Sequence, residues 1–473
     1  MIPQSITFWL NGHKVVLPPA TRPAQSLLDW LRGPAGLRGT KEGCAEGDCG
    51  ACTIVLEQPD GARVPLNACL TLLGQMHGRA IRTVEGLRDP AGAPHPVARI
   101  LAEHDGTQCG FCTPGFVMAA WAALAAPGDP HEAVAGNLCR CTGYRPIVAA
   151  MAAMRQTPMP PMPPGPPGAF DAGATLFQAE GQGFHLPRDL PTLLSLRAAH
   201  PEAWLLAGGT DLGLRVSEHR ERPPLVICLL AVPELQRLRI DDKTIRIGAG
   251  LAYHRLLAAL RGLDDPVALP FARLLARLGS AQIRGLGTLG GNLGTASPIG
   301  DALPPLVALG AEVILASLRG TRRLSVEAFL TGYRTNALAP DEVMTEICLP
   351  RAAAGDVVAM EKLSRRHDQD ITAVGLSAWL RIVGGRVRAA RIAAGGLGPK
   401  VLRAAAAEHV LMGAPWSLAT VRAAAAALDR DIAPLDDLRG SAAWRRAAAA
   451  GLLERVWWRE TRPDVEPMSL ESL

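Results

Sequence analysis

The sequence predicts a multidomain α+β protein, and three observations lead to this prediction. The chain has 473 residues, enough for about three domains of the usual size of ~150 residues each. Strand-like and helix-like patterns alternate along much of it, as in α+β or α/β domains. A proline-rich segment from Gln156 to Gly168 cannot supply enough backbone donors for a helix or a sheet, and we expect it to be an extended spacer between domains.

The first residues predict a β-hairpin followed by a helix. Residues 5–10 and 15–17 are strand-like, and the Asn11-Gly12 pair between them readily adopts the positive φ angles of a tight hairpin turn. Ser26 precedes the apolar-periodic segment 27–31 and is expected to cap a helix there. A cysteine-rich loop is expected to follow this helix.

The remaining blocks change from helical to mixed patterns. The alanine-rich stretch from 97 to 154 predicts a separate helical unit. Residues beyond Pro350 begin with strand-like segments and end with alanine- and arginine-rich amphipathic helices. The helices expected in these blocks include 115–126, 147–154 and 254–261, and the strands include 225–229 and 244–247.

Composition and charge restrict the class of protein. Hydrophobic residues make up 48% and charged residues 20% of the chain, as in ordinary globular proteins. The formal net charge is +5 and the basic residues are scattered, so we expect no nucleic-acid partner. No signal peptide is visible, and no apolar run reaches the ~18 residues that a membrane helix needs. We therefore expect a cytoplasmic protein with no membrane partner.

The ten cysteines are unevenly distributed along the chain. Thiols stay reduced in the cytoplasm and structural disulfides are rare there, so a group of cysteines indicates a metal. Cys228 and Cys348 stand alone in apolar contexts and are expected to be small core residues. The isolated His13, His77 and His95 are expected to be solvated, and we assign them no role. The other eight cysteines lie in the first third of the chain: Cys44, Cys49, Cys52, Cys69, Cys109, Cys112, Cys139 and Cys141.

The first set of four has the pattern Cys44-x4-Cys49-x2-Cys52, with Cys69 further along the chain. This is the plant-type ferredoxin spacing for a [2Fe-2S] cluster. Interspersed glycines allow the backbone to curl closely and bring its amides toward the sulfide ions. A structural zinc site is the alternative, but zinc knuckles usually use paired C-x2-C units and leave the x4 spacing unexplained.

The second set combines Cys109-x2-Cys112 with Cys139-x-Cys141. A C-x-C pair is awkward for a disulfide and uncommon in zinc ribbons, yet it can deliver two ligands to one side of a compact cluster. The spacing by itself favours a second cluster over zinc but leaves both possible.

Three runs around these cysteines, 42–53, 108–115 and 137–144, resemble the iron–sulfur portion of the molybdenum hydroxylases of the xanthine dehydrogenase type. The resemblance implies a β-grasp, plant-type ferredoxin domain that holds one [2Fe-2S] cluster. It also implies a four-helix domain that holds another cluster, nearer to the molybdenum cofactor.

Two glycine-rich stretches follow the spacer. In 204–211 a strand-like run leads into Gly208, Gly209 and Thr210, where backbone N–H groups can reach a phosphate, although most Gly-Gly pairs are simply turns. The stretch 284–293 formally contains G-x-G-x-x-G. It does not follow a hydrophobic strand, and it leads into residues that read as a loop from Gly294. We therefore do not expect this motif to form the nucleotide-binding loop of a dinucleotide fold.

Together with 297–301, these stretches resemble the FAD domain of the same family, which is similar in fold to the vanillyl-alcohol oxidase flavoproteins. The resemblance implies that 204–211 hold the diphosphate and that Asp301 reaches the sugar or diphosphate portion. Leu278 stands at a position where the family often has an aromatic residue that covers the adenine. The implied FAD contacts are Trp204, Leu205, Leu206, Ala207, Gly208, Gly209, Thr210, Asp211, Leu278, Thr288, Gly291, Asn292, Asp301, Met344 and Lys362.

The charged run 361–371 is similar to the family's mobile loop beside the flavin. Lys362 matches a lysine that contacts FAD, and Met344 matches a residue near the flavin ring. By itself the run would be a solvated loop. Residues 332–334 resemble the segment that borders the nicotinamide pocket; without the family, Tyr333 would be an ordinary buried tyrosine.

The resemblance implies an oxidoreductase of the xanthine dehydrogenase type with two [2Fe-2S] clusters, FAD and NAD as acceptor. No catalytic residue is assigned. A molybdopterin domain is not expected after the flavin region, so molybdopterin is expected on a large partner subunit, in a heterodimer of dimers. Aldehydes, carbon monoxide and N-heterocycles are alternative substrates, and a non-catalytic iron–sulfur carrier is a second alternative. The expected divisions are a ferredoxin-like domain at 1–85, a helical [2Fe-2S] domain at 86–155, a linker at 156–178, an FAD-binding domain at 179–350 and, at 351–473, a C-terminal domain like that of carbon monoxide dehydrogenase flavoproteins.

Overall fold

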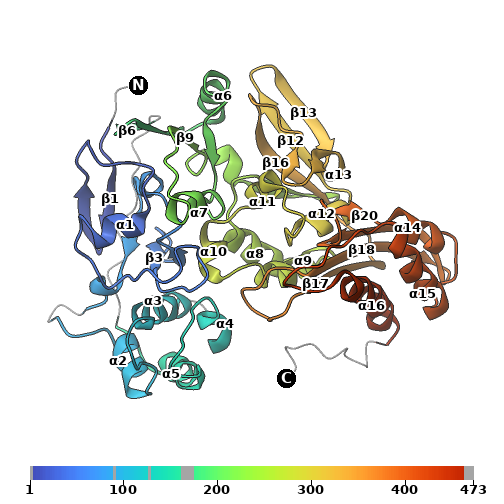
Figure 1. Ribbon diagram of the computed structural model, residues 1–473, viewed down its shortest axis with the longest axis horizontal. Helices are drawn as coiled ribbons and strands as arrows, with labels where there is room; N and C mark the ends of the chain where they lie inside the picture. Colours follow the sequence, from blue (N-terminus) through green and yellow to red (C-terminus); the bar gives the residue numbers. More distant parts are fainter. Residues whose placement is uncertain (1–3, 89–91, 126–128, 161–174, 463–473) are drawn as a thin grey trace. The chain divides into compact units, whose positions relative to one another are not determined.

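The chain is divided by its internal contacts into two compact units. The computed structural model describes residues 4–88, 92–125, 129–160 and 175–462, whose helices and strands are labelled in Figure 1. The predicted spacer lies largely at 161–174, outside these residues. The first unit comprises residues 1–232 and 279–287, and the second comprises 233–278 and 288–473.

The first unit begins with a five-stranded sheet in the order β2-β1-β5-β3-β4. Strands β1 and β5 are parallel and their neighbours are antiparallel, which is the predicted β-grasp arrangement. Asn11 and Gly12 have φ angles of 54° and 85°, as the predicted hairpin turn requires. The predicted cap is also present, because Ser26 accepts a hydrogen bond from the Asp29 amide. The elements are β1 (Thr7–Leu10), β2 (His13–Val16), α1 (Leu27–Arg32), β3 (Thr53–Glu57), β4 (Arg63–Asn67) and β5 (Ala80–Arg82).

A group of helices follows the sheet and packs on it through α3. Trp121 of α3 is buried at the centre of this group. The guanidinium of Arg63, on β4, lies 4.1 Å from the centroid of the Trp121 ring, a cation–π contact that joins helix and sheet. The elements in the described residues are the 3₁₀ turns η1 (Leu73–Met76) and η2 (Val84–Gly86) and the helices α2 (Pro96–Glu103), α3 (Thr113–Ala123), α4 (Pro130–Val134) and α5 (Arg145–Gln156).

A second sheet of the first unit has the order β6-β7-β9-β8. Its strands β7, β9 and β8 are parallel, and their apolar residues Phe184, Leu206 and Val226 share one hydrophobic core with the β-grasp sheet. Helix α10 also belongs to this unit by its contacts, although it comes much later in the sequence. The elements are β6 (Thr175–Ala179), β7 (Gln182–Leu186), α6 (Leu190–Ala199), β8 (Trp204–Leu206), α7 (Leu212–Ser217), β9 (Leu225–Cys228) and α10 (Ala281–Leu286).

The second unit contains an antiparallel sheet in the order β10-β11-β16-β12-β13. Helix α8 carries the apolar residues Leu256, Leu257 and Leu260 on its buried face. The elements of this part are η3 (Pro233–Gln236), β10 (Leu238–Ile240), β11 (Thr244–Gly248), α8 (Tyr253–Arg261), α9 (Ala268–Ala276), α11 (Leu289–Thr295), α12 (Leu303–Ala308), β12 (Glu312–Ser317), β13 (Gly320–Ser325), α13 (Val326–Phe329), β14 (Leu330–Gly332), β15 (Thr335–Asn336) and β16 (Val343–Pro350).

The C-terminal part of the second unit is an antiparallel meander followed by helices, as the sequence predicts for residues beyond Pro350. Helices α14 and α16 pack on this sheet and share an apolar core with it. No helix among the described residues combines the length and apolar character needed to cross a membrane. The elements are β17 (Asp356–Leu363), β18 (Val374–Val383), β19 (Arg386–Gly395), β20 (Leu402–Arg403), α14 (Ala405–Leu411), α15 (Leu418–Ala427), η4 (Leu428–Arg430) and α16 (Ala442–Thr461).

Two local predictions are wrong. Gly294 and Thr295 were expected in a loop but end α11, because Thr288 caps this short helix by accepting a hydrogen bond from the Gly291 amide. His77 and His95 are buried rather than solvated. Each uses its Nδ1 atom to accept a backbone N–H, from Thr7 for His77 and from Val97 for His95, so both are structural.

Candidate functional site

The first set of cysteines lies on the loop before β3 and just after β4. Cys52 and Cys69 are buried, and their sulfur atoms lie 3.3 Å apart. The Cys44 sulfur accepts hydrogen bonds from the backbone amides of Glu46 and Cys49 at 3.4 and 3.3 Å. Amide hydrogen bonds of this kind stabilise thiolates and tune iron–sulfur centres. A Cβ atom on Gly43 would lie only 2.7 Å from the Cys49 sulfur, so the loop leaves no room for a side chain there.

The electrostatics of this set divides it into two pairs. A hydrogen bond from Cys49 lowers the pKa of Cys44 to about 5, and the same contact raises the pKa of Cys49. The hydrogen-bonding contact between Cys52 and Cys69 lowers the pKa of Cys52 and raises the pKa of Cys69. Charge interactions of Cys44 with Cys52 and Cys69 link the two pairs. One thiol of each pair therefore resists ionisation unless positive charge is supplied.

The second set is held at the ends of two helices. Cys112 immediately precedes α3, and the Cys139 and Cys141 loop leads into α5. The Thr142 hydroxyl donates to the Cys139 sulfur at 3.2 Å, and the Tyr144 hydroxyl accepts the Cys139 amide at 3.0 Å. Tyr144 has a φ angle of 69°, which turns the chain sharply into α5.

Contacts within this set again pair the thiols, Cys112 with Cys139 and Cys109 with Cys141. Burial raises the pKa of Cys112 to about 12, with the Cys139 contact adding to the rise. The contact with Cys109 raises the pKa of Cys141. Cys109 and Cys141 are exposed to solvent, whereas Cys139 is buried.

The two sets fit [2Fe-2S] clusters better than single zinc ions. All ten cysteines are free thiols. Each set consists of two pairs, and a two-iron cluster takes two thiolates at each iron, whereas zinc takes four ligands around one point. Ferric iron would also supply the positive charge that the crowded thiols need to ionise together.

The predicted diphosphate residues lie in the first unit, on β8 and the loop that follows it. Gly208 and Gly209 are buried. In the part of the chain that the structure describes, the backbone N–H groups of Gly208, Gly209 and Thr210 donate to no protein acceptor. Buried backbone donors are almost always paired, so a ligand with acceptor oxygens fits this loop. A Cβ atom on Gly208 would collide with the Leu286 carbonyl oxygen, so only glycine fits there.

The predicted FAD contacts Asp301 and Lys362 meet in the second unit. The Lys362 ammonium lies 2.7 Å from Asp301, and both side chains are less than a tenth exposed. The Thr372 hydroxyl donates to the other carboxylate oxygen of Asp301, and the Lys362 ammonium also donates to the Arg277 carbonyl. The Tyr253 hydroxyl is buried with no hydrogen-bond partner among the described residues, and burial raises its pKa.

The remaining predicted contacts of the second unit are distributed over its elements. Thr288 precedes α11, which contains Gly291 and Asn292, and the buried Oδ1 atom of Asn292 has no partner among the described residues. Leu278 follows α9, and Met344 lies on β16; both are less than a tenth exposed. A buried amide oxygen without a partner fits a site that a polar ligand group completes.

The G-x-G-x-x-G stretch does not form a dinucleotide loop. Its first glycine, Gly285, lies inside helix α10, where a dinucleotide fold requires a strand to lead into the motif. Leu66 and Val64 of β4 crowd the space that a side chain on Gly285 would occupy, and Ala249 crowds Gly290. Both positions therefore need glycine because neighbouring residues pack too closely for a side chain.

The expected charged loop is found in part. Glu361, Lys362 and Leu363 belong to β17 and Lys362 is buried, whereas residues 364–371 lie in no helix or strand. Tyr333, expected to be buried if it had only a structural role, is 64% exposed in the turn between β14 and β15. Cys228 and Cys348 are buried, as predicted for core residues.

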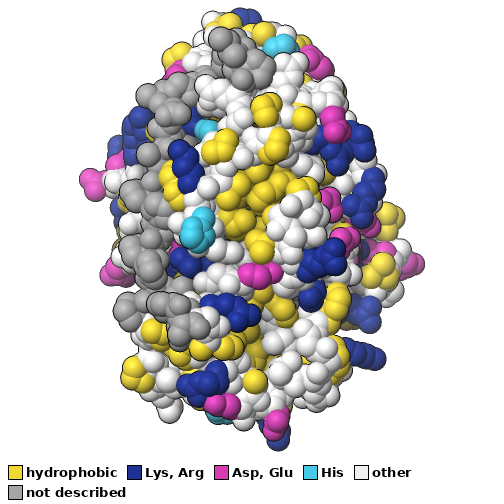
Figure 2. All heavy atoms as spheres, turned by 90° about the vertical axis from the view of Figure 1, so that its left-hand side faces the viewer, with side chains coloured by type: hydrophobic (Ala, Val, Ile, Leu, Met, Phe, Trp, Pro, Cys, Tyr) yellow, Lys and Arg dark blue, Asp and Glu magenta, His cyan; other side chains and the backbone are white. Residues whose placement is uncertain are grey.

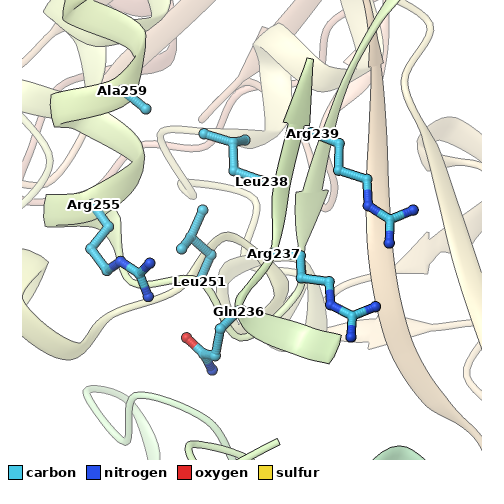
Figure 3. Close-up of a pocket in the computed structure, with 7 residues that line it drawn as sticks. All are labelled: Gln236, Arg237, Leu238, Arg239, Leu251, Arg255 and Ala259. Atoms are coloured by element: carbon cyan, nitrogen blue, oxygen red, sulfur yellow. The ribbon is translucent and has the colours of Figure 1, made fainter. Parts of the chain in front are cut away.

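A separate cavity of about 450 Å³ in the second unit is lined by residues of η3, β10 and α8 (Figure 3). Leu238 and Leu251 lie between Arg255 of α8 and Arg239 of β10 in this view, and Arg237 and Arg239 extend away from α8. Binding sites for small molecules usually have polar groups that converge on one point. The cavity contains none of the predicted site residues, and we assign it no ligand.

Basic and acidic side chains are interspersed on the face of the molecule drawn in Figure 2. Nucleic-acid surfaces usually show a continuous basic patch. This face has none.

Several residues at these sites were not singled out from the sequence. Thr142 and Tyr144 lie within the cysteine motif, so their hydrogen-bonding side chains were a usable signal. Gln75 is buried and its amide contacts the Ala207 and Gly208 carbonyl oxygens, both at 3.4 Å. Ser217 donates to the Ala45 carbonyl in the first cysteine loop. Nothing local distinguishes Gln75 or Ser217, because their partners are far away in the sequence.

Three protein-family models match the chain in succession. The model described as a [2Fe-2S] binding domain matches residues 83–152. The model described as the FAD binding domain in molybdopterin dehydrogenase matches residues 177–352. The model described as the CO dehydrogenase flavoprotein C-terminal domain matches residues 359–459.

Known proteins resemble the chain over much of its length. It is 32% identical to a xanthine dehydrogenase of Drosophila pseudoobscura pseudoobscura over 96% of its residues, but it spans only 39% of that enzyme's length. Among solved structures, a chain of carbon monoxide dehydrogenase from Hydrogenophaga pseudoflava is 31% identical, with a TM-score of 0.54 over 57% of this chain and 94% of that one. A chain of quinoline 2-oxidoreductase from Pseudomonas putida 86 is 28% identical, with a TM-score of 0.53 over 58% of this chain and 95% of that one.

Proposed function

The chain belongs to the molybdenum hydroxylase family, with the iron–sulfur and flavin domains of that family, and from this premise we propose that it passes electrons from a molybdenum site on a partner polypeptide to NAD. The observation that carries the proposal is the gathering of eight free thiols into two paired sets. The bound clusters would supply one-electron transfer, and FAD would convert single electrons into a pair for NAD.

The residues that would hold these groups follow from the sites above. Cys44, Cys49, Cys52 and Cys69 would ligate one cluster, and Cys109, Cys112, Cys139 and Cys141 the other. The free amides after β8 would bind the FAD diphosphate. Asp301, Lys362 and Asn292 would contact FAD through polar atoms, and Leu278 and Met344 through apolar ones.

We further propose hypoxanthine and xanthine as the substrates of the complete enzyme, with urate as product. The match to a xanthine dehydrogenase over 96% of this chain supports this choice. The likeness to carbon monoxide dehydrogenase and quinoline 2-oxidoreductase chains keeps carbon monoxide and N-heterocycles as alternatives, and aldehydes remain a third. Assaying the assembled enzyme with each substrate and NAD distinguishes them, since the substrate would bind on the partner.

The molybdenum cofactor is proposed to lie on a large partner subunit, in a heterodimer of dimers. The chain spans 39% of the length of the fly xanthine dehydrogenase, so most of such an enzyme has no counterpart here. Phe111, Leu138 and Tyr144 are 49%, 45% and 38% exposed beside the second set of thiols. Exposed apolar side chains next to exposed ligands fit a surface that a partner covers. We also infer a cytoplasmic location, because reduced thiols persist there.

The decisive experiment measures iron, zinc and FAD in the chain purified with its partner. We expect about four irons and one FAD per chain, with visible absorption from both cofactors. A Cys112→Ser variant should lose one cluster, about half of the iron, and retain FAD. Stoichiometric zinc, or iron without FAD, would overturn the proposal. The latter result would favour a non-catalytic iron–sulfur carrier.

A further inference from the structure

The two thiol loops are joined by backbone and side-chain hydrogen bonds in the first unit. The Leu138 amide donates to the Cys49 carbonyl oxygen at 2.9 Å. Leu138 precedes Cys139, so one hydrogen bond connects a residue of the first set to the neighbour of a residue of the second. The Asn137 amide group donates to the Gly50 carbonyl oxygen at 2.8 Å and reinforces the same junction.

Gln282 of α10 completes this junction from a distant part of the chain. Its side chain is 3% exposed. Its Nε2 atom donates to Thr53 Oγ1 and Asn137 Oδ1, both at 3.0 Å, and lies 3.4 Å from the Gly136 carbonyl oxygen. Thr53 is adjacent to Cys52, so one carboxamide contacts both thiol loops.

The direction of each hydrogen bond in this network is fixed. The Gly50 carbonyl can only accept, and it receives the Thr53 hydroxyl at 2.6 Å and the Asn137 amide group. Thr53 Oγ1 and Asn137 Oδ1 are then left to accept, and only the NH₂ side of Gln282 can serve them. The donors and acceptors that face one another here therefore have one arrangement, while Gln282 Oε1 is buried with no hydrogen-bond partner among the described residues.

We propose that Gln282 is a positioning residue that sets the electronic coupling between the two cluster sites. This inference rests on the proposed function, because it requires both clusters. Gln282 holds Thr53 and Asn137, and through them it keeps the Cys49 carbonyl and the Leu138 amide in contact. That contact gives electrons a route of covalent bonds and a single hydrogen bond from the Cys49 sulfur to the Cys139 sulfur.

The test compares Gln282→Leu with the native chain, each purified with its partner. An electron is introduced by flash photoreduction, and the rate of equilibration between the clusters is followed by absorption. The magnetic interaction between the two reduced clusters is measured by electron paramagnetic resonance. We expect four irons and FAD to be retained, a weaker or broadened magnetic interaction, and slower equilibration between the clusters, because the electronic coupling through the Cys49–Leu138 contact falls when that contact is no longer held.

Two matched variants separate positioning from general destabilisation. Gln182→Leu removes another buried glutamine of the same unit, whose amide donates to the Pro223 carbonyl, and it should leave the rate unchanged. If Gln282→Leu does not fold, Thr53→Val removes the bridging hydroxyl and should slow equilibration, whereas Thr53→Ser should restore it. An unchanged rate and magnetic interaction in Thr53→Val and in folded Gln282→Leu would overturn the inference. Absence of four irons from the native chain would instead overturn the proposed function.

Discussion

Neighbouring charges and hydrogen-bond donors determine the pKa values of the site cysteines and the burial of Lys362. The pKa values of Cys44 and Cys52 are lowered by contacts with neighbouring thiols and amides, while the pKa values of their partners Cys49 and Cys69 are raised. The cysteine motif identifies the sulfurs, but it does not reveal how they pair. Lys362 gives a similar example, since a lysine in a charged run is expected in solvent, whereas contacts with Asp301 and the Arg277 carbonyl allow it to be buried.

Asp356 permits a test of stability against pH at the residue scale. Its carboxylate accepts two hydrogen bonds from Arg381, both at 2.8 Å, and one from the Trp379 ring nitrogen at 3.0 Å. The Arg381 contact holds the pKa of Asp356 below its ordinary value of 3.8. We expect Asp356→Asn to lower the free energy of unfolding by about 1–2 kcal/mol at pH 7, because a charge-assisted pair is lost.

The sign of the pH effect follows from this lowered pKa. The Asp356 contribution is fully present above pH 3.8, and it is lost as the pH falls through the lower value of the folded state. The difference between Asp356→Asn and the native chain should therefore shrink below pH 3.8. Urea unfolding followed by circular dichroism at several pH values measures it. An equal difference at pH 7 and pH 2 would contradict the assignment.

At the scale of elements, the loop between β8 and α7 shows why small residues occupy a predicted phosphate site. Gly208 packs against the Leu286 carbonyl of α10, and Gly213 of α7 packs against the Leu70 backbone beside Cys69. The Ser217 hydroxyl at the end of α7 donates to Ala45 in the first thiol loop. One short helix thus connects the predicted diphosphate loop directly with a thiol loop.

Gly208→Ala tests this loop. The added methyl group would meet the Leu286 backbone, so α10 or the loop must move, at a cost of about 1–3 kcal/mol. We expect FAD affinity to fall at least about tenfold if the shift disturbs the amides, while iron content is retained. Gly451→Ala is the control, because a Cβ atom there meets nothing within 4 Å. Unchanged flavin fluorescence titrations for Gly208→Ala would count against the predicted role of the loop.

At the scale of the whole molecule, two units divide the predicted sites between them. Both thiol sets and the loop after β8 belong to the first unit, and Asp301, Lys362 and Asn292 belong to the second. Helix α10 lies within the stretch matched by the FAD-binding model, yet its contacts place it in the first unit, beside the thiol loops. Membership of a unit therefore does not follow the order of the sequence.

The proposed partner surface gives a prediction at this scale. Replacing Phe111 and Leu138 by serine should reduce recovery of the molybdopterin-bearing subunit in pull-down experiments at least about tenfold, since loss of a central apolar anchor typically costs ~2 kcal/mol. Iron and FAD contents should not change. Leu435 and Leu438 are 77% and 75% exposed elsewhere, and their replacement by serine is the matched control. Equal loss from both double variants would show that Phe111 and Leu138 have no specific role in binding the partner.

The amino-acid sequence by itself determined the features that depend on neighbouring residues. Asn11-Gly12 specifies its hairpin and Ser26 its helix cap because the interacting groups lie within a few positions. The cysteine spacing and the surrounding motifs likewise identified the family, and the three family models agree with it. Such features can be predicted because the interacting residues lie within a few positions of one another in the sequence.

Only the tertiary structure decided which groups meet across long stretches of chain. It placed Gln282 against Thr53 and Asn137, buried Lys362 with Asp301, and buried His77 and His95. The physical reason is that a buried polar side chain must find a partner, and any of many distant residues can serve as one. The sequence pattern records that such a residue exists, but the partner is chosen when the elements pack together.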